Sequence, residues 1–125
     1  MSDFVKNADE NIMNFKDRLR FPANFDMLDR EVRIGGKKAG FFFIDGFVQE
    51  DMVEKLMQFF YSLKPEDVSN IDKFLENGMP YTEVDRADKY ERVITSFLAG
   101  VTVLFVDGFD EAVLIDRSEE HTSEL

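Results

Sequence analysis

The chain has 125 residues, no cysteine, 14 phenylalanines and a formal net charge of −11. Its length suits one small domain or a piece of a larger protein, and its hydrophobic fraction of 44% is enough for a packed core. The negative charge disfavours a nucleic-acid partner, and the lack of cysteine excludes disulfides, thiolate metal sites and cysteine nucleophiles. The sequence shows no apolar run of the roughly 18 residues that a membrane span needs, and its start predicts no signal peptide.

The first third of the chain predicts a helix followed by a β-hairpin. Residues 4–19 place apolar side chains at helical spacing along one face. Residues 27–34 alternate apolar and charged side chains, which predicts a half-exposed edge strand. A Gly35-Gly36 turn leads into residues 39–45, whose unbroken apolar run predicts a strand covered on both faces.

The spacing of apolar residues changes in the middle of the chain. In residues 50–63, apolar side chains recur at intervals of three and four residues, which predicts a helix that ends at Lys64-Pro65. A shorter helix is predicted over residues 69–76, and residues 81–84 predict a short strand.

The last third predicts a helix and a second hairpin. We interpret Asp85 as the N-cap of a helix whose apolar stripe covers residues 90–98, with Gly100 at its C-terminal end. Residues 101–106 and 111–116 predict two strands joined by a tight turn.

The predicted element order is therefore α-β-β-α-α-β-α-β-β. Strand–helix–strand units imply parallel pairing with right-handed crossovers, whereas the two hairpins add antiparallel strands. We predict an α/β domain with a mixed sheet, two β-hairpins and covering helices.

Residues 117–125, RSEEHTSEL, need a separate interpretation. They can be written in codons as AGA TCG GAA GAG CAC ACG TCT GAA CTC, which agrees in frame with a widely used sequencing adapter. We therefore predict that residues 1–116 are a truncated soluble α/β domain and that residues 117–125 are not native. The alternative is a genuine polar C-terminal end. The only histidine of the chain, His121, lies in this segment.

The stretches FFFIDGF (41–47) and VLFVDGF (103–109) are nearly the same. Each places an Asp-Gly pair after a strand, where α/β proteins often bind ligands or metals. Asp-Gly is also a favoured turn pair, because Gly accepts a positive φ and Asp bonds nearby backbone N–H groups. We interpret Asp45, Gly46, Asp107 and Gly108 as structural turns. A duplication is the weaker interpretation, since the first stretch leads into a helix and the second into a strand.

The sequence contains few residues suited to catalysis. Without cysteine or a native histidine, only lysines and carboxylates remain as nucleophiles and bases. We expect no catalytic, cofactor-binding or metal-binding residue. Two alternatives stay open: a soluble α/β enzyme that uses Asp45 or Asp107 as a metal or acid–base carboxylate, and a free-standing regulatory module.

Residues 94–116, ITSFLAGVTVLFVDGFDEAVLID, resemble the GerA family of spore germination proteins, the A subunits of germinant receptors. The similarity lies in a helix ending at Leu98-Ala99-Gly100, an apolar strand, Asp107-Gly108, and a strand ending in Ile-Asp. Residues 37–57 are similar to the family's Ile-Asp-Gly strand with its following helix, and residues 29–36 to the strand before it. The blocks agree in order and distance over about residues 25–116.

The resemblance implies a function beyond what the residues show. Family members carry a soluble N-terminal domain before a bundle of transmembrane helices, and they form receptors with B and C subunits in the inner spore membrane. The A subunits are thought to assemble into a nutrient-gated ion channel. We therefore expect a non-catalytic soluble domain, facing the cytoplasm, without cofactor. It would contact B, C and other A subunits, transmit their state to a missing channel region, and meet the membrane only through missing C-terminal helices.

Overall fold

We describe the fold from a computed structural model, which describes residues 2–19, 27–44, 50–76 and 82–117. The order of elements is the one predicted, with one short 3₁₀ helix, η1, added. The elements are α1 (Ala8–Leu19), β1 (Met27–Ile34), β2 (Lys37–Ile44), α2 (Glu50–Ser62), η1 (Pro65–Val68), α3 (Ile71–Glu76), β3 (Thr82–Ala87), α4 (Tyr90–Leu98), β4 (Thr102–Val106) and β5 (Ala112–Arg117).

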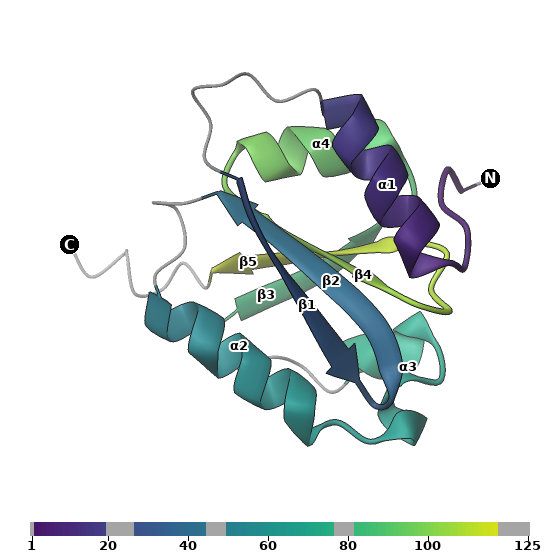
Figure 1. Cartoon of the computed structure of the whole chain (residues 1–125), viewed down its shortest axis with the longest axis vertical. Coiled ribbons are helices and arrows are strands. Elements are labelled where there is room, and N and C mark those ends of the chain that lie inside the picture. Colours follow the sequence, from purple (N-terminus) through teal and green to yellow (C-terminus); the bar gives the residue numbers. More distant parts are fainter. Residues whose placement is uncertain (1, 20–26, 45–49, 77–81, 118–125) are drawn as a thin grey trace.

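The five strands form one sheet in the order β1-β2-β4-β5-β3 (Figure 1). The α/β class, the two hairpins and the edge position of β1 are confirmed. The expected parallel neighbours are wrong, because all four pairings of the described strands are antiparallel. The unit β3-α4-β4 does connect two strands of the same direction, but β5 lies between them and pairs with both.

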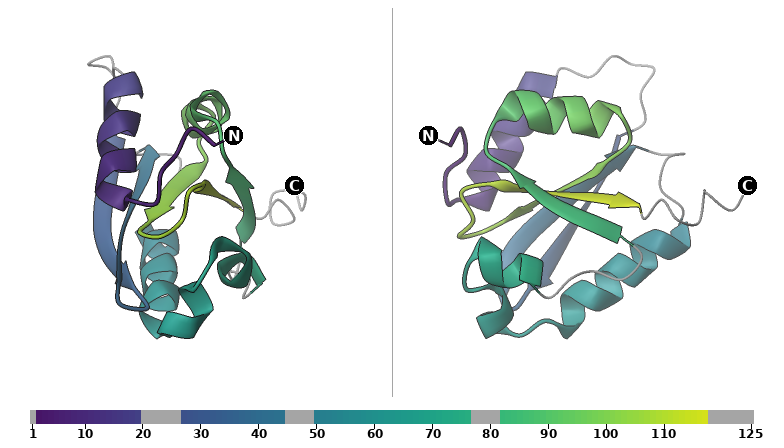
Figure 2. Two further views of the ribbon diagram at one scale, coloured as in Figure 1. Left: turned by 90° about the vertical axis from the view of Figure 1, so that its right-hand side faces the viewer. Right: turned by 180° about the vertical axis from the view of Figure 1, so that it is seen from behind.

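Helices cover both faces of this sheet (Figures 1 and 2). Along β2, Phe42 and Ile44 pack on the side of α1 and α4, whereas Phe41 and Phe43 pack on the side of α2 and α3. The prediction of a strand covered on both faces is therefore confirmed. This alternation explains why four apolar residues follow one another without a polar position between them.

The hairpin of β1 and β2 turns at Gly35-Gly36, as predicted. Both glycines have positive φ, +58° and +84°, which is the geometry of a type I′ turn. Gly35 also has no room for a side chain. A Cβ there would lie 2.6 Å from Cγ2 of Val68 and 2.8 Å from the carbonyl oxygen of Lys64, so η1 packs directly against the turn.

Helix α1 starts at Ala8, four residues later than Phe4, where the apolar spacing begins. The side-chain oxygen of Asn7 accepts a hydrogen bond from the N–H of Glu10 at 2.9 Å, which is an N-cap contact. Phe4 instead lies in the segment before the helix and is buried against the rings of Tyr90 and Phe105, at centroid distances of 4.3 and 5.8 Å. The apolar spacing therefore extends past the true start of the helix.

The assignment of Asp85 as an N-cap is wrong, because Asp85 lies inside β3. Helix α4 starts at Tyr90, and its N-cap residue, Lys89, makes no side-chain cap hydrogen bond. Oδ2 of Asp3 accepts a hydrogen bond from the N–H of Tyr90 at 3.0 Å instead. The N–H of Tyr90, which has no partner within the helix, thus bonds a residue 87 positions away in the sequence.

We predict that Phe15→Ala will lower the free energy of unfolding by about 3–5 kcal/mol, because it leaves a cavity in the core. Phe15 is fully buried, and its ring lies 5.2–5.4 Å from the rings of Phe42, Phe97 and Phe105. Met13→Ala is the matched control on the same helix, since Met13 is 63% exposed. Urea unfolding followed by circular dichroism measures both, and equal losses would contradict the packing.

Candidate functional site

The turn between β4 and β5 holds Asp107 and Gly108, two of the residues selected from the sequence. Oδ1 of Asp107 accepts a hydrogen bond from the N–H of Ala8, the first residue of α1, at 2.8 Å. The N–H of Asp107 donates to the carbonyl of Lys38 at 2.9 Å, and the N–H of Gly108 donates to the carbonyl of Lys6 at 2.8 Å. This turn therefore joins β2, β4 and the beginning of α1.

The contact of Asp107 has a clear physical basis. The first N–H groups of a helix lack partners within the helix and carry a partial positive charge, which a carboxylate stabilises. Gly108 has φ +95°, a conformation that L side chains rarely adopt, so glycine suits this turn. The Asp107 carboxylate is thereby engaged in a structural hydrogen bond.

Asp45 and Gly46, the other two selected residues, lie outside the described residues. The described ends of β2 and β4 are nevertheless far apart. Val106, at the end of β4, pairs with Ala39, and β2 continues for five more residues to Ile44. At about 3.3 Å per residue, this separates the two strand ends by about 17 Å. The pairing therefore does not bring the end of β2 near Asp107.

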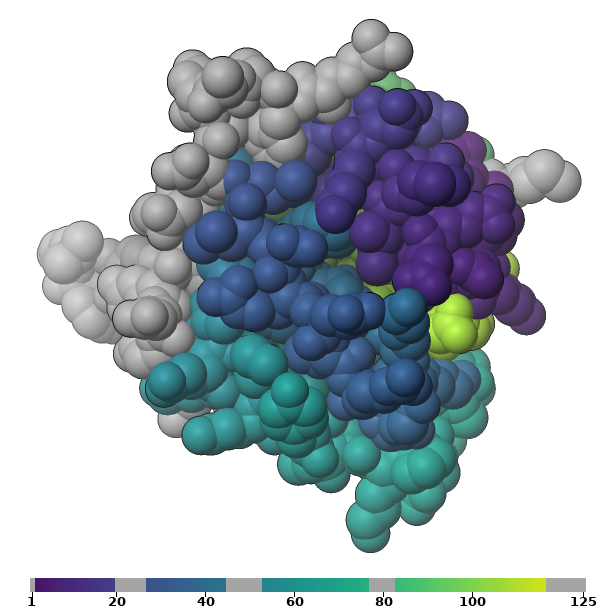
Figure 3. Space-filling view, viewed as in Figure 1, coloured from purple at the N-terminus to yellow at the C-terminus, as the bar shows by residue number. Residues whose placement is uncertain are grey.

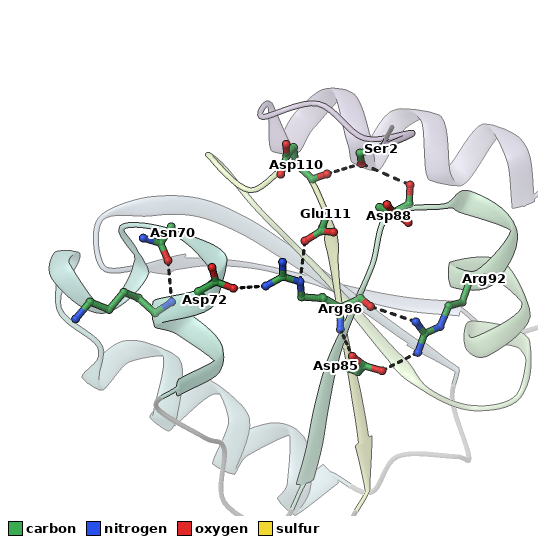
Figure 4. A network of polar contacts seen from close by, with 10 residues as sticks. Ser2, Asn70, Asp72, Asp85, Arg86, Asp88, Arg92, Asp110 and Glu111 are labelled. Atoms are coloured by element: carbon green, nitrogen blue, oxygen red, sulfur yellow. Dashed lines mark hydrogen bonds and ion pairs between the residues drawn. The ribbon is translucent and has the colours of Figure 1, made fainter.

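A network of charged residues connects α3, β3, α4 and the loop before β5 (Figure 4). Of its members, only Asp85 was named in the sequence analysis, and as an N-cap. Arg86 of β3 forms ion pairs with Asp72 of α3 and with Glu111, the latter at 3.0 Å. Arg92 of α4 pairs with Asp85 at 2.7 Å and donates to the carbonyl of Arg86 at 3.3 Å. The network links elements that are distant in the sequence.

The electrostatics of this network stabilise its charged forms. The hydrogen bond to Asp72, followed by the charge of Glu111, raises the pKa of Arg86. The backbone N–H of Arg86, followed by the side chain of Arg92, lowers the pKa of Asp85. Both guanidinium groups are paired with carboxylates, so the arrangement holds elements together and does not poise a group for proton transfer.

The N-terminal segment belongs to the same surface. The hydroxyl of Ser2 donates to the carbonyl of Asp110 at 2.5 Å, and the N–H of Asp3 donates to the carbonyl of Asp88 at 2.8 Å. Together with the cap on Tyr90, these bonds attach the start of the chain to the β3–α4 connection and to the β4–β5 connection. Short-range sequence patterns carry no signal for such pairs.

Within the described parts of the chain, no group of three or more histidine or acidic side chains converges on a point that could hold a metal ion. Among the same residues, no helix is both long enough and apolar enough to cross a membrane.

Comparison with known proteins assigns the family. The sequence model of the Bacillus/Clostridium GerA spore germination proteins matches residues 14–124, which is most of the chain. The chain therefore belongs to the GerA family of spore germination proteins, as the resemblance in residues 25–116 predicted.

The fold has a counterpart of known structure. The chain is similar to the N-terminal domain of the A subunit of the Bacillus megaterium spore germinant receptor GerK3, with a TM-score of 0.74 and 19% sequence identity. The match covers 94% of this chain and 48% of that chain, so the present sequence spans about half the length of the solved domain. No curated protein sequence matches the chain.

We predict that Asp107→Ala will lower the free energy of unfolding by about 1–2 kcal/mol, because it removes the acceptor at the start of α1. Asp107→Asn keeps an acceptor oxygen and should cost less. Asp110→Asn is the control, because Asp110 bonds Ser2 through its backbone carbonyl. Chemical unfolding measures the loss of unfolding free energy in each of the three variants. An equal loss in Asp107→Ala and Asp110→Asn would refute the contact.

The pKa of Asp85 predicts a pH dependence. The ordinary pKa of an aspartate is 3.8, and the folded pKa of Asp85 lies below it. Such a carboxylate contributes its full stabilisation above the ordinary pKa, and this contribution is lost as the pH falls through the folded pKa. The stability difference between the native chain and Asp85→Asn should therefore be constant near neutral pH and shrink below about pH 4. It should be small, since the pair is exposed. Urea unfolding across pH tests this, and a difference that grows in acid would contradict it.

Proposed function

We propose that this chain is a non-catalytic domain of a spore germinant receptor A subunit. Its role is to contact the B and C subunits and other A subunits and to transmit their state to a membrane channel region outside this sequence. The observation that carries the proposal is the family match over residues 14–124. The fold shared with the GerK3 A-subunit domain supports it at the level of architecture.

The contacts of Asp107, Arg86 and Arg92 favour a role in packing over a role in chemistry. The Asp107 carboxylate binds the start of α1, and the charges of Arg86 and Arg92 are paired. We propose that Asp107 and Gly108, together with Asp45 and Gly46, act as structural turns. A domain of this kind acts through its packed faces and its surface.

The remaining parts of the proposal concern the whole protein. We propose that the full-length protein resides in the inner spore membrane or the cell membrane, and that this domain is soluble and faces the cytoplasm. We also propose that residues 1–116 are a truncated native domain and that residues 117–125 derive from an adapter. The coverage of 48% of the solved GerK3 domain supports a longer native sequence.

A genetic experiment in spores tests this function. Deletion of codons 2–116 in frame from the native receptor gene should abolish germination in response to the nutrients that this receptor serves. Germination by a trigger that bypasses nutrient receptors is the internal control. Loss of optical density of the spore suspension reports the rate, and normal nutrient germination of the deletion strain would refute the proposal.

A second strain separates packing from chemistry. The double substitution Asp45→Asn and Asp107→Asn keeps an oxygen acceptor at each position, so nutrient germination should remain within about twofold of the parent rate. An enzyme that depends on either carboxylate would lose activity by orders of magnitude with the fold intact. Germination as defective as in the deletion strain would therefore favour the enzymatic alternative.

A further inference from the structure

No described strand pairs with the outer edge of β1. β1 pairs only with β2 among the described strands, and Figure 3 shows the β1–β2 segment, in blue, at the surface between α1 and α2. Ile34 and Lys37 flank a two-residue turn, so they exchange both backbone hydrogen bonds. The alternation of an antiparallel pair then directs the backbone of Glu31 and Arg33 away from β2.

One side-chain contact agrees with this assignment. Nη1 of Arg30 donates to the carbonyl oxygen of Asp29 at 3.0 Å, as expected for a carbonyl that points to the open side of β1. The guanidinium thus covers the edge at Asp29. The part of the edge that stays open begins at Glu31.

A hollow of about 360 Å³ lies at this part of the edge, and its lining is formed by Glu31, Val32, Arg33, Lys38 and Tyr61. Tyr61 of α2 is 61% exposed beside the strand. Tyrosine and arginine are enriched in protein interfaces, where they combine apolar contact with hydrogen bonding. An open strand with an exposed tyrosine beside it is the geometry that accepts an added strand.

The charges along β1 favour one register of pairing between two copies of β1. If another copy of β1 pairs antiparallel at the open edge, two-fold symmetry requires one residue to face itself. A joint centred on Arg30 places Asp29 opposite Glu31 of the second copy, twice. A joint centred on Glu31 places Asp29 opposite Arg33 twice, but it also places two glutamates opposite each other at its centre. A joint centred on Val32 places Glu31 opposite Arg33 of the second copy, twice. Opposite charges stabilise such cross-strand pairs and like charges destabilise them.

We propose that β1 is a self-pairing edge, through which two copies of this chain join antiparallel over residues 31–33 with Val32 at the centre. The sheet then continues from one copy into the next, and Tyr61 of each copy lies beside the joint. The contact is short, so association is weak and gains strength where receptor subunits are concentrated in one membrane. The pairing specifies one of the contacts between A subunits and rests on the proposed function only for its role in the receptor.

Charge reversal tests the register of the joint. Sedimentation equilibrium of the 125-residue chain should show a concentration-dependent dimer. Glu31→Arg and Arg33→Glu each place like charges opposite one another twice, and each should weaken association at least about tenfold. The double variant restores opposite charges and should dimerise like the parent. Glu91→Arg, on the exposed face of α4, is the control for the change of net charge and should leave association unchanged.

The outcomes are distinct. A parent chain that stays monomeric at all concentrations overturns the inference, and so does a dimer that both single reversals leave intact, because another surface or partner would then be responsible. Circular dichroism verifies that each variant is folded. The deletion experiment in spores is unaffected by either result, so failure of the pairing and failure of the proposed receptor role can be told apart.

A disulfide provides an independent test, since the chain has no cysteine of its own. Residues that face each other in a non-hydrogen-bonded antiparallel pair have Cα atoms about 4.5 Å apart, which lies within the range of about 4.4–6.8 Å found for disulfides. Val32→Cys should form a covalent dimer on mild oxidation. Met13→Cys, an exposed position on α1, should not. Equal cross-linking of the two variants, or none by Val32→Cys, contradicts the joint at Val32.

Discussion

The rest of the structure depends on burial of β2 from both faces. Phe41 stacks with Phe43 and meets Phe60 of α2 on one side, whereas Phe42 meets Phe15 of α1 on the other. Burial of each large apolar side chain contributes about 1.5–3 kcal/mol, so a helix layer on only one face would leave a large apolar surface in water. The three-layer arrangement follows from this one strand, and the connections of the chain are arranged around it.

Hydrogen bonds and ion pairs, including those of the Asp-Gly turn after β4, join the helices to the sheet. Asp107 holds the start of α1, Asp3 holds the start of α4, and the charged network of Arg86 and Arg92 joins α3 and α4 through β3. These polar groups are used within the fold, which leaves the surface and the sheet edge as the parts available to partners. This division of roles fits a receptor component that acts by contact.

The sequence predicted features that arise from local patterns. The two hairpins, the edge strand at residues 27–34 and the two-sided burial of Phe41–Ile44 follow from spacing and turn residues over a few positions. The parallel neighbours were predicted wrongly, because periodicity does not tell that β5 returns between β3 and β4. The N-cap at Asp85 was wrong because Asp3, 87 positions away, caps α4. The contacts of Arg86 and Asp107 likewise join distant segments, and single-sequence patterns do not report such pairs.

The central claim is that this sequence is part of a membrane receptor subunit, and resequencing the source DNA past codon 116 with a different library chemistry tests it most directly. The account predicts that Arg-Ser-Glu-Glu is replaced by more of the soluble domain, followed by several apolar segments of about 20 residues, the length of a membrane-spanning helix. Nine genuine codons followed by a stop would contradict it and leave a small free-standing member of the GerA family without a channel to control.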